Sequence, residues 1–428
     1  MPKKGYPWDI NNPPRLERHS FAKHRIIQEY LIRYIKVLCI NPKIENLNIS
    51  LVDGFSGGGI YVNEHSELSE GSPLIMLRAV RQAEAEINLY RDEQGLNRKL
   101  KVSPIYYFID EDQKALSCLR SYLIKEGFGP EIDKSIHLLQ GQYEKLSGML
   151  LAKIQSSGRA QRSIFLLDQY GYTDVPTYII QDIFQKIAKP EVLFTFAIDS
   201  LTAYLSHETT GIYEKSLQRI GLINILQEKI CIDDKHNDPD WLLGVQAAFS
   251  EELQTKCGAK YYTPFYILSE KSNRGYWFVH FSNHVRANEV MKELHWSIKN
   301  HFRHFGRPGL QMLMYDPKQE SCKKTIDLFG FRFDEHAKEQ TENALLDELP
   351  RFIHNFNGIE YGKFQESIGN ITPACATIYN PVLNRLLKAR EIIITTADGK
   401  EKRKAIHLKS DDILKLPSQG KLFFTGFL

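Results

Sequence analysis

The sequence predicts an α/β protein with a doubly wound, mostly parallel sheet, followed by a smaller α+β domain. First, five apolar strand-like runs alternate with helical patterns between residues 48 and 198. Strands separated by helices pair in parallel, because a crossover helix returns the chain to the same edge of the sheet. Second, the runs 261–268 and 275–282 are joined too closely for a helix, which predicts an antiparallel hairpin closing the sheet. Third, the pattern changes beyond residue 340 to helices and a hairpin.

Each element follows from its hydrophobic periodicity. A helix is predicted from residue 19 to about 40, because its apolar residues recur every three or four positions. The parallel strands are predicted at 48–53, 104–110, 135–139, 163–168 and 191–198. The helices between them are predicted at about 72–89, 112–126, 143–155 and 176–188, with Asp112 as an N-cap and Pro176 in a first turn.

Length and composition indicate two or three soluble globular domains. We expect a helical segment at 1–46, an α/β domain at 47–310 with a mostly helical insertion at about 200–260, and a small domain at 335–428. The net charge of +3 is too small to imply a nucleic-acid partner by itself. Six scattered cysteines without a C-x-x-C pair argue against a zinc site or disulfide framework and fit reduced cytoplasmic thiols. The polar N-terminus is no signal peptide, and no apolar run approaches the ~20 residues of a membrane span.

A glycine-rich motif follows the first predicted strand: Asp53, Gly54, Phe55, Ser56, Gly57, Gly58 and Gly59. Glycines allow a sharp turn and a close approach to a ligand, and the exposed N–H groups can receive an anion. The motif lacks the G-x-G-x-x-G spacing of dinucleotide sites and the lysine of a P-loop. It is similar to the S-adenosylmethionine loop of class I methyltransferases, whose carboxylate and glycines hold the methionine part. A glycine-rich turn without a ligand is the alternative.

Polar side chains also follow the second and third strands. Asp110 can accept hydrogen bonds from ribose hydroxyls, or it could simply cap the next helix. Gln142 can offer a donor and an acceptor to an adenine edge, although a plain strand-to-helix turn is an equal alternative. The terminal antiparallel hairpin of the sheet favours a methyltransferase over a nicotinamide dehydrogenase.

The fourth strand ends in Asp168-Gln169-Tyr170-Gly171-Tyr172, where amino-methyltransferases carry Asp-Pro-Pro-Tyr. In those enzymes the acid orients the target amine and the aromatic ring stacks on the acceptor. Asp168, Tyr170 and Tyr172 are therefore the candidate catalytic residues, unless Asp168 only orders the turn at Gly171. Lys23 and His24, at the start of the first helix, could contact the cofactor carboxylate or the substrate, or belong to an ordinary helix start. No metal site is expected.

The C-terminal region resembles a winged helix. Helices are predicted at 341–355 and 381–390, and a hairpin formed by 391–396 and 403–408 around the turn Asp398-Gly399. Four basic residues crowd the hairpin tip, where they could meet phosphates: Lys400, Lys402, Arg403 and Lys404. The alternative is a solvated hairpin in a domain that mediates protein contacts.

Five segments together resemble the three-Cys-motif partner proteins (TcmP) of bacteria, over roughly residues 19–305. They are His-Ser-Phe-Ala-Lys-His at 19–24, Val-Asp-Gly-Phe-Ser-Gly-Gly-Gly at 52–59, Gly-Ser-Pro-Leu at 71–74, Leu-Asp-Gln-Tyr-Gly-Tyr at 167–172, and the segment 281–292. The resemblance implies a fold similar to class I methyltransferases and a companion protein, encoded nearby, that carries the cysteines and resembles radical-type iron–sulfur enzymes. The sequence departs from the family at Ser56, Gly58 and Gln169, and the last change weakens the assignment of an amine acceptor.

Three hypotheses follow. The leading one is an S-adenosylmethionine-dependent methyltransferase, in which Asp53 and the glycine loop hold the methionine part and Asp110 holds the ribose. Asp168 and Tyr170 would then face a nucleic-acid or other amine or hydroxyl acceptor. The second is a non-catalytic scaffold for the iron–sulfur companion. The third is nucleic-acid binding through the winged helix, with the α/β domain as a regulator.

Overall fold

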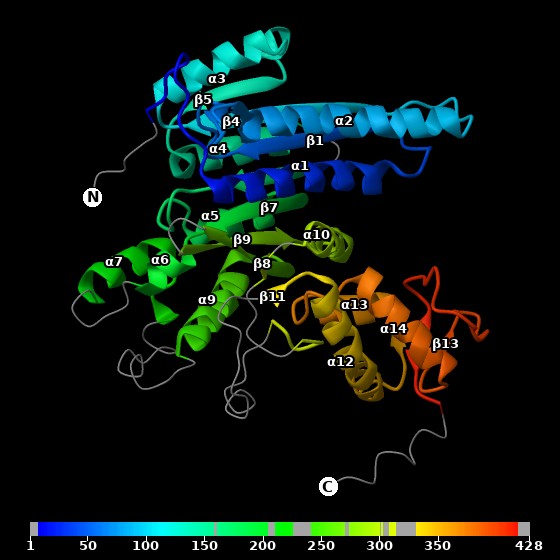
Figure 1. Cartoon of the computed structure of the whole chain (residues 1–428). Coiled ribbons are helices and arrows are strands. Elements are labelled where there is room, and N and C mark those ends of the chain that lie inside the picture. The colour runs from blue at the N-terminus through cyan, green and yellow to red at the C-terminus, as the bar shows by residue number, and fades with distance from the viewer. Residues whose placement is uncertain are drawn as a thin grey trace. The chain divides into compact units, whose positions relative to one another are not determined.

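The computed structural model describes residues 7–157, 161–203, 210–225, 241–269, 274–299, 301–302, 308–313 and 331–417 (Figure 1). The chain forms two compact units, Met1–Val290 and Met291–Leu428. Of the helices within the described ranges, none combines the length and apolarity needed to cross a membrane.

The first unit is built on a seven-stranded sheet with the order β5-β4-β1-β6-β7-β9-β8. Its strands are β1 (Asn46–Asp53), β4 (Lys101–Asp110), β5 (Ile136–Gln140), β6 (Arg162–Leu167), β7 (Lys189–Phe196), β8 (Tyr261–Ser269) and β9 (Arg274–Ser282). The first five of that order are parallel, and β9 pairs antiparallel with both β7 and β8. This order, with one reversed strand next to the edge, is the class I methyltransferase arrangement, and it confirms the predicted fold class.

Helices cover both faces of the sheet. Tyr106 and Tyr107 are neighbours in β4, so their side chains point to opposite faces. Tyr106 faces α2 (Ser72–Glu93), which packs along α1 (Arg18–Cys39). Tyr107 lies beneath the ammonium of Lys153 in α4 (Tyr143–Ser156), 5.3 Å from the ring centroid. The remaining helices of the parallel part are α3 (Gln113–Lys125) and α5 (Thr177–Lys186), and α4 contacts α5.

Two segments between the strands extend the predicted pattern. Between β1 and α2, the chain forms a small antiparallel hairpin of β2 (Ile60–Val62) and β3 (Leu68–Glu70). The insertion before β8 is helical where it is described, with α6 (Ile198–Ala203), α7 (Thr210–Ile220) and α9 (Trp241–Cys257). Helix α10 (Val285–Ile298) follows β9.

The second unit contains a winged helix, which confirms that part of the prediction. Its elements are, in chain order, α12 (Glu335–His354), β12 (Ile359–Glu360), α13 (Tyr361–Ile368), α14 (Ala376–Lys388), β13 (Ile393–Thr395) and β14 (Ile413–Lys415), after a short pair of β10 (His301–Phe302) and β11 (Phe331–Arg332). The three strands pair in the order β12-β14-β13. Leu345, Phe364, Leu383 and Leu414 are fully buried and form part of the core between the helices and the sheet.

The predicted second strand at 403–408 is wrong, because β13 pairs with β14 ten residues further on. The turn at Gly399 does form, with its N–H donating to the carbonyl of Thr396 over 2.8 Å. Only an isolated bridge at Glu401 follows it. Asp412 is almost fully buried and holds the intervening loop, pairing with the Lys402 ammonium and accepting the N–H of Lys409. Residues 396–412 therefore form the wing.

Two helices of this unit begin earlier than predicted. α12 starts at Glu335, because the side chain of Asp334 caps it by accepting the N–H of Ala337 over 2.9 Å. α14 starts at Ala376, so Pro381 lies inside the helix and not at its first turn.

Candidate functional site

The carboxyl ends of the five parallel strands meet at one cavity of about 600 Å³. Each strand contributes a residue at or just beyond its end: Gly54 after β1, Asp110 at the end of β4, Gln142 after β5, Asp168 after β6 and Ala197 after β7. Ser20, Lys23 and His24 of α1 complete the wall. Open α/β sheets bind ligands in this position, because the loops after the strands converge there.

The glycine loop is fastened to the neighbouring strand. The N–H of Ser56 donates to the carbonyl of Ile109, and the N–H of Gly57 donates to Oδ2 of Asp110, each over 2.9 Å. Gly57 has a φ of +59°, a backbone conformation that favours glycine. Gly54, Phe55 and Gly57 line the cavity, whereas Ser56 and Gly58 are not among the residues that line it.

Asp53 lies behind the cavity wall. Its side chain is 0% exposed, and its two oxygens accept the N–H of Phe55 over 3.1 Å and the hydroxyl of Ser72 over 2.6 Å. Burial raises the pKa of the Asp53 carboxyl to about 7, against the effect of these two donors. Ser72 itself lines the cavity. Asp53 thus shapes the loop and the start of α2 and does not present its own oxygens to the cavity.

Asp110 does line the cavity. Its Oδ1 accepts the N–H of Asp112 over 2.8 Å, and its Oδ2 accepts the N–H of Gly57. Burial raises the pKa of the Asp110 carboxyl, while both N–H donors oppose that effect. A carboxylate offers about four acceptor positions, so about two remain for a ligand. The cap of α3 is made by Asp112, whose side chain accepts the N–H of Lys114 over 2.8 Å.

Gln142 also reaches the cavity. It follows β5, and its Nε2 donates to Oε2 of Glu111 over 3.2 Å. Glu111 and Tyr143 line the cavity beside it. The ends of β4 and β5 therefore present a carboxylate and an amide, respectively, next to an aromatic ring.

An ion pair joins α1 to the end of β6. Nζ of Lys23 lies 2.6 Å from both carboxylate oxygens of Asp168. Lys23 is only 6% exposed, yet both residues line the cavity. Burial by itself would raise the pKa of the Asp168 carboxyl, but the Lys23 ammonium, helped by the Thr195 hydroxyl and by His24, outweighs it and holds that pKa below its usual value.

The residues after Asp168 have separate roles. Gln169 is 3% exposed, and its Oε1 accepts the N–H groups of Asp174 and Val175 over 2.9 and 3.0 Å. It therefore fixes the loop from inside. Tyr170 is 71% exposed and stands at the rim of the cavity. Tyr172 is not among the lining residues, and its ring packs edge-on against Phe196 with centroids 6.2 Å apart.

Trp8 also lines the cavity, although no sequence pattern pointed to it. The segment before α1 is held by β2, because Leu16 donates to the carbonyl of Val62, and Val62 donates to the carbonyl of Pro14. This places the indole against the glycine loop, where a Cβ on Gly58 would lie 2.4 Å from a ring atom of Trp8. A single aromatic residue in a proline-broken segment has no periodicity that could have revealed this contact.

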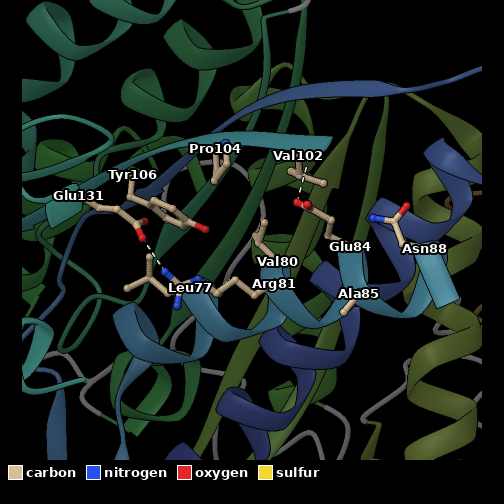
Figure 2. Close-up of a pocket in the computed structure, with 10 residues that line it drawn as sticks. All are labelled: Leu77, Val80, Arg81, Glu84, Ala85, Asn88, Val102, Pro104, Tyr106 and Glu131. Carbon is tan, nitrogen blue, oxygen red and sulfur yellow. Dashed lines mark hydrogen bonds and ion pairs between the residues drawn. The ribbon is translucent and has the colours of Figure 1, made fainter. Parts of the chain in front are cut away.

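A second, smaller hollow of about 350 Å³ lies between α2 and β4 (Figure 2). Figure 2 shows Tyr106 and Pro104 facing Arg81 and Val80 across it. It shares no residue with the larger cavity, and it lies along the length of β4, away from the loops after the strands. Arg81 is paired with Glu131 over 2.5 Å. The larger cavity is therefore the candidate site.

Within the described ranges, no three His, Cys, Asp or Glu side chains are arranged to hold a metal ion.

The basic residues predicted at the hairpin tip lie in the wing. Lys400, Arg403 and Lys404 are exposed. Lys402 is partly buried and is held by its ion pair with Asp412, so it closes the wing and is not presented to a partner.

Comparison with known proteins identifies a domain in the second unit. Residues 314–399 match the family model of the GMT-like wHTH domain, which includes the winged helix up to β13. No curated protein sequence matches the chain.

Solved structures resemble the chain only distantly. An O-methyltransferase from Bacillus cereus in complex with SAH has 11% sequence identity and a TM-score of 0.29, over 58% of this chain and 80% of that one. The O-methyltransferase TomG from Streptomyces achromogenes, in complex with SAM, has 10% identity and a TM-score of 0.28, over 63% and 92%. Protein LPL1258 from Legionella pneumophila has 11% identity and a TM-score of 0.26, over 46% and 73%. The fold assignment therefore rests on the strand order of this chain.

Proposed function

We propose that the chain binds S-adenosylmethionine in the larger cavity and transfers its methyl group to an acceptor there. The observation that carries this proposal is the convergence of the glycine loop, Asp110 and Asp168 on one cavity, at the ends of β1, β4 and β6. The bound cofactor would supply a methyl group made electrophilic by its sulfonium. The chain would supply binding, orientation and a site shielded from water.

The residues present fit such a cofactor. A carboxylate can only accept hydrogen bonds, and the two open acceptor positions of Asp110 suit the two hydroxyls of a ribose, which would donate to them. Gln142 and Tyr143 offer an amide and a ring for a planar base. Gly54 and Gly57 let the methionine part approach the backbone closely. Asp53 would act as a positioning residue, through its hydrogen bonds to Ser72 and Phe55.

Titration calorimetry with S-adenosylhomocysteine tests this proposal. Asp110→Ala should weaken binding by roughly 10-fold or more, since a hydrogen bond to a charged group is worth about 1.5–3 kcal/mol. Asp92→Ala, at an exposed carboxylate near the end of α2, is the matched control and should bind as the wild type does. Absence of binding to the wild type, or equal affinities of the wild type and Asp110→Ala, would contradict the proposal.

A second candidate function is nucleic-acid binding by the winged helix. The wing exposes Lys400, Arg403 and Lys404, and α14 exposes Arg385 and Lys388. Phosphate contacts by such residues release counterions, so affinity should fall steeply with salt. Fluorescence anisotropy with duplex DNA and RNA tests this function. Lys400, Arg403 and Lys404 changed together to Ala should weaken binding and reduce the salt slope by about 3, at roughly 1 per phosphate contact. Binding that does not respond to salt would contradict it.

The resemblance to three-Cys-motif partner proteins supports a protein partner, an iron–sulfur companion for which this chain would be a non-catalytic scaffold. That alternative predicts co-purification with the companion. It also predicts that a cofactor bound in the cavity transfers no methyl group to any cell fraction.

A further inference from the structure

We propose that the methyl acceptor is a hydroxyl group, held between Lys23 and Asp168. The inference rests on the proposed cofactor binding and goes beyond it, because it selects the chemical class of the acceptor. The evidence is the geometry of the ion pair and the hydrogen-bonding positions that the two side chains leave open for a ligand.

The ion pair presents one donor and one acceptor side by side. An ammonium has three N–H donors, and Lys23 directs two of them to the oxygens of Asp168. Within the described residues, Nζ of Lys23 makes no other hydrogen bond, so one N–H is left for a ligand. Each Asp168 oxygen accepts from Lys23 and has a second lone pair; the Thr195 hydroxyl is close enough to use one of these two, and the other is left for a ligand. Both residues line the cavity.

The pair lies next to the glycine loop. The N–H of Gly54 donates to the carbonyl of Leu166 over 2.9 Å, which joins the start of the loop to the end of β6, two residues before Asp168. The negative charge of Asp168 contributes to the raised pKa of Asp53, at the start of the same loop. An acceptor bound at Asp168 would therefore lie beside the part of the cavity proposed for the methionine end of the cofactor.

A hydroxyl satisfies both open positions. Its O–H can donate to Asp168 while a lone pair of its oxygen accepts from Lys23, and the other lone pair points to the methyl carbon. An aromatic amine meets only half of this arrangement, because its lone pair is delocalised into the ring and accepts poorly from Lys23. A protonated amine would place a second positive charge beside the ammonium of Lys23, which costs energy in a partly buried site.

The same pair takes up the proton that the transfer step releases and holds the acceptor oxygen in place. The hydroxyl oxygen attacks the methyl carbon, and a C–O bond forms as the C–S bond breaks. The electron pair of the broken bond stays on sulfur, which becomes a neutral thioether. The acceptor oxygen becomes strongly acidic as it forms its third bond, so its proton passes to the carboxylate of Asp168. Lys23 holds the oxygen in place and stays protonated.

The test identifies the bond that the transferred methyl group makes. The full-length chain is incubated with cofactor carrying a ¹³C-labelled methyl group, in an extract of the cells that produce it, and the labelled products are examined by NMR. RNA and DNA oligonucleotides of one sequence are tested in parallel. Their bases carry the same exocyclic amines, but only RNA carries 2′-hydroxyls. The expected result is label in O-methyl groups. Label in N-, C- or S-methyl groups would overturn the inference, and so would binding of the cofactor without any transfer.

Two further measurements separate this inference from the proposed function. Calorimetry with S-adenosylhomocysteine comes first, and absence of binding there would refute the proposed function itself. Asp168→Asn should keep the cofactor affinity within about threefold but lower methyl transfer about 100-fold, because it removes the proton acceptor. Lys23→Gln should lower transfer similarly. Unchanged transfer by both folded variants would overturn the role of the pair. Asp92→Asn, at an exposed carboxylate outside the cavity, is the control and should transfer methyl groups as the wild type does.

Discussion

The buried carboxyl of Asp53 should make the stability of the protein depend on pH. In the folded state its pKa is raised to about 7 by burial, whereas an exposed aspartate has a pKa of about 3.9. Between these two values the folded state holds a proton that the unfolded state has released. Stability contributed by Asp53 is therefore fully present below pH ~4 and is lost as the pH rises towards 7.

The magnitude follows from the shift. Each pH unit between the two pKa values lowers the free energy of unfolding by about 1.4 kcal/mol, and about three units give a total near 4 kcal/mol. Above pH ~8 the contribution of Asp53 no longer changes. Carboxyls with lowered pKa values, such as Asp168, act in the opposite direction, so the effect must be measured as a difference between variants.

Asp53→Asn isolates the effect, because asparagine can keep both hydrogen bonds, accepting from Phe55 and donating to Ser72. Urea denaturation at pH 5, 6, 7 and 8 gives the free energy of unfolding of each protein. The wild type should lose stability relative to Asp53→Asn by about 1.4 kcal/mol per unit from pH 5 to 6 and by less above pH 7. A difference that stays constant from pH 5 to 8 would show that the pKa of Asp53 is not raised in the folded protein. Asp92→Asn, at an exposed position, is the matched control.

Three other substitutions test the packing of the site and of the wing. Lys23→Met should lower the free energy of unfolding by about 2 kcal/mol in urea denaturation, less than for a fully buried pair because the carboxylate partner is partly exposed. Gly58→Ala should reduce the affinity for S-adenosylhomocysteine in calorimetry, since the added Cβ would displace Trp8. Gly148→Ala is the control: its added Cβ would meet no atom within 4 Å, so the affinity should not change. Lys402→Ala should lower the melting temperature of the winged helix, since it leaves a buried carboxylate unpaired; an unchanged melting temperature would contradict the role given to this pair.

The sheet could be predicted because its central strands, such as β1, β6 and β7, are largely buried on both faces and appear in the sequence as apolar runs between helical patterns. The positions after the strands were predictable for the same reason. Once β1, β4 and β6 are located, Gly54, Asp110 and Asp168 must follow at one edge of a parallel sheet.

Such patterns could not predict contacts between segments that are far apart in the sequence. Lys23 and Asp168 are 145 positions apart, and only the packing of α1 brings them together. Asp53 and Asp110 look alike in sequence, yet their hydrogen bonds place one behind the wall and the other in the cavity. In the second unit, the loop between β13 and β14 is closed by the buried carboxylate of Asp412, which pairs with Lys402 and accepts the N–H of Lys409.

We propose that an adenosyl cofactor occupies the cavity at the ends of β1, β4 and β6. A crystal structure of the chain with S-adenosylhomocysteine would locate it. We expect the ribose within hydrogen-bonding distance of Asp110 and the homocysteine against Gly54 and Gly57. A ligand bound in the hollow beside Tyr106, or one in the cavity with Asp110 making no contact to the ribose, would contradict this proposal.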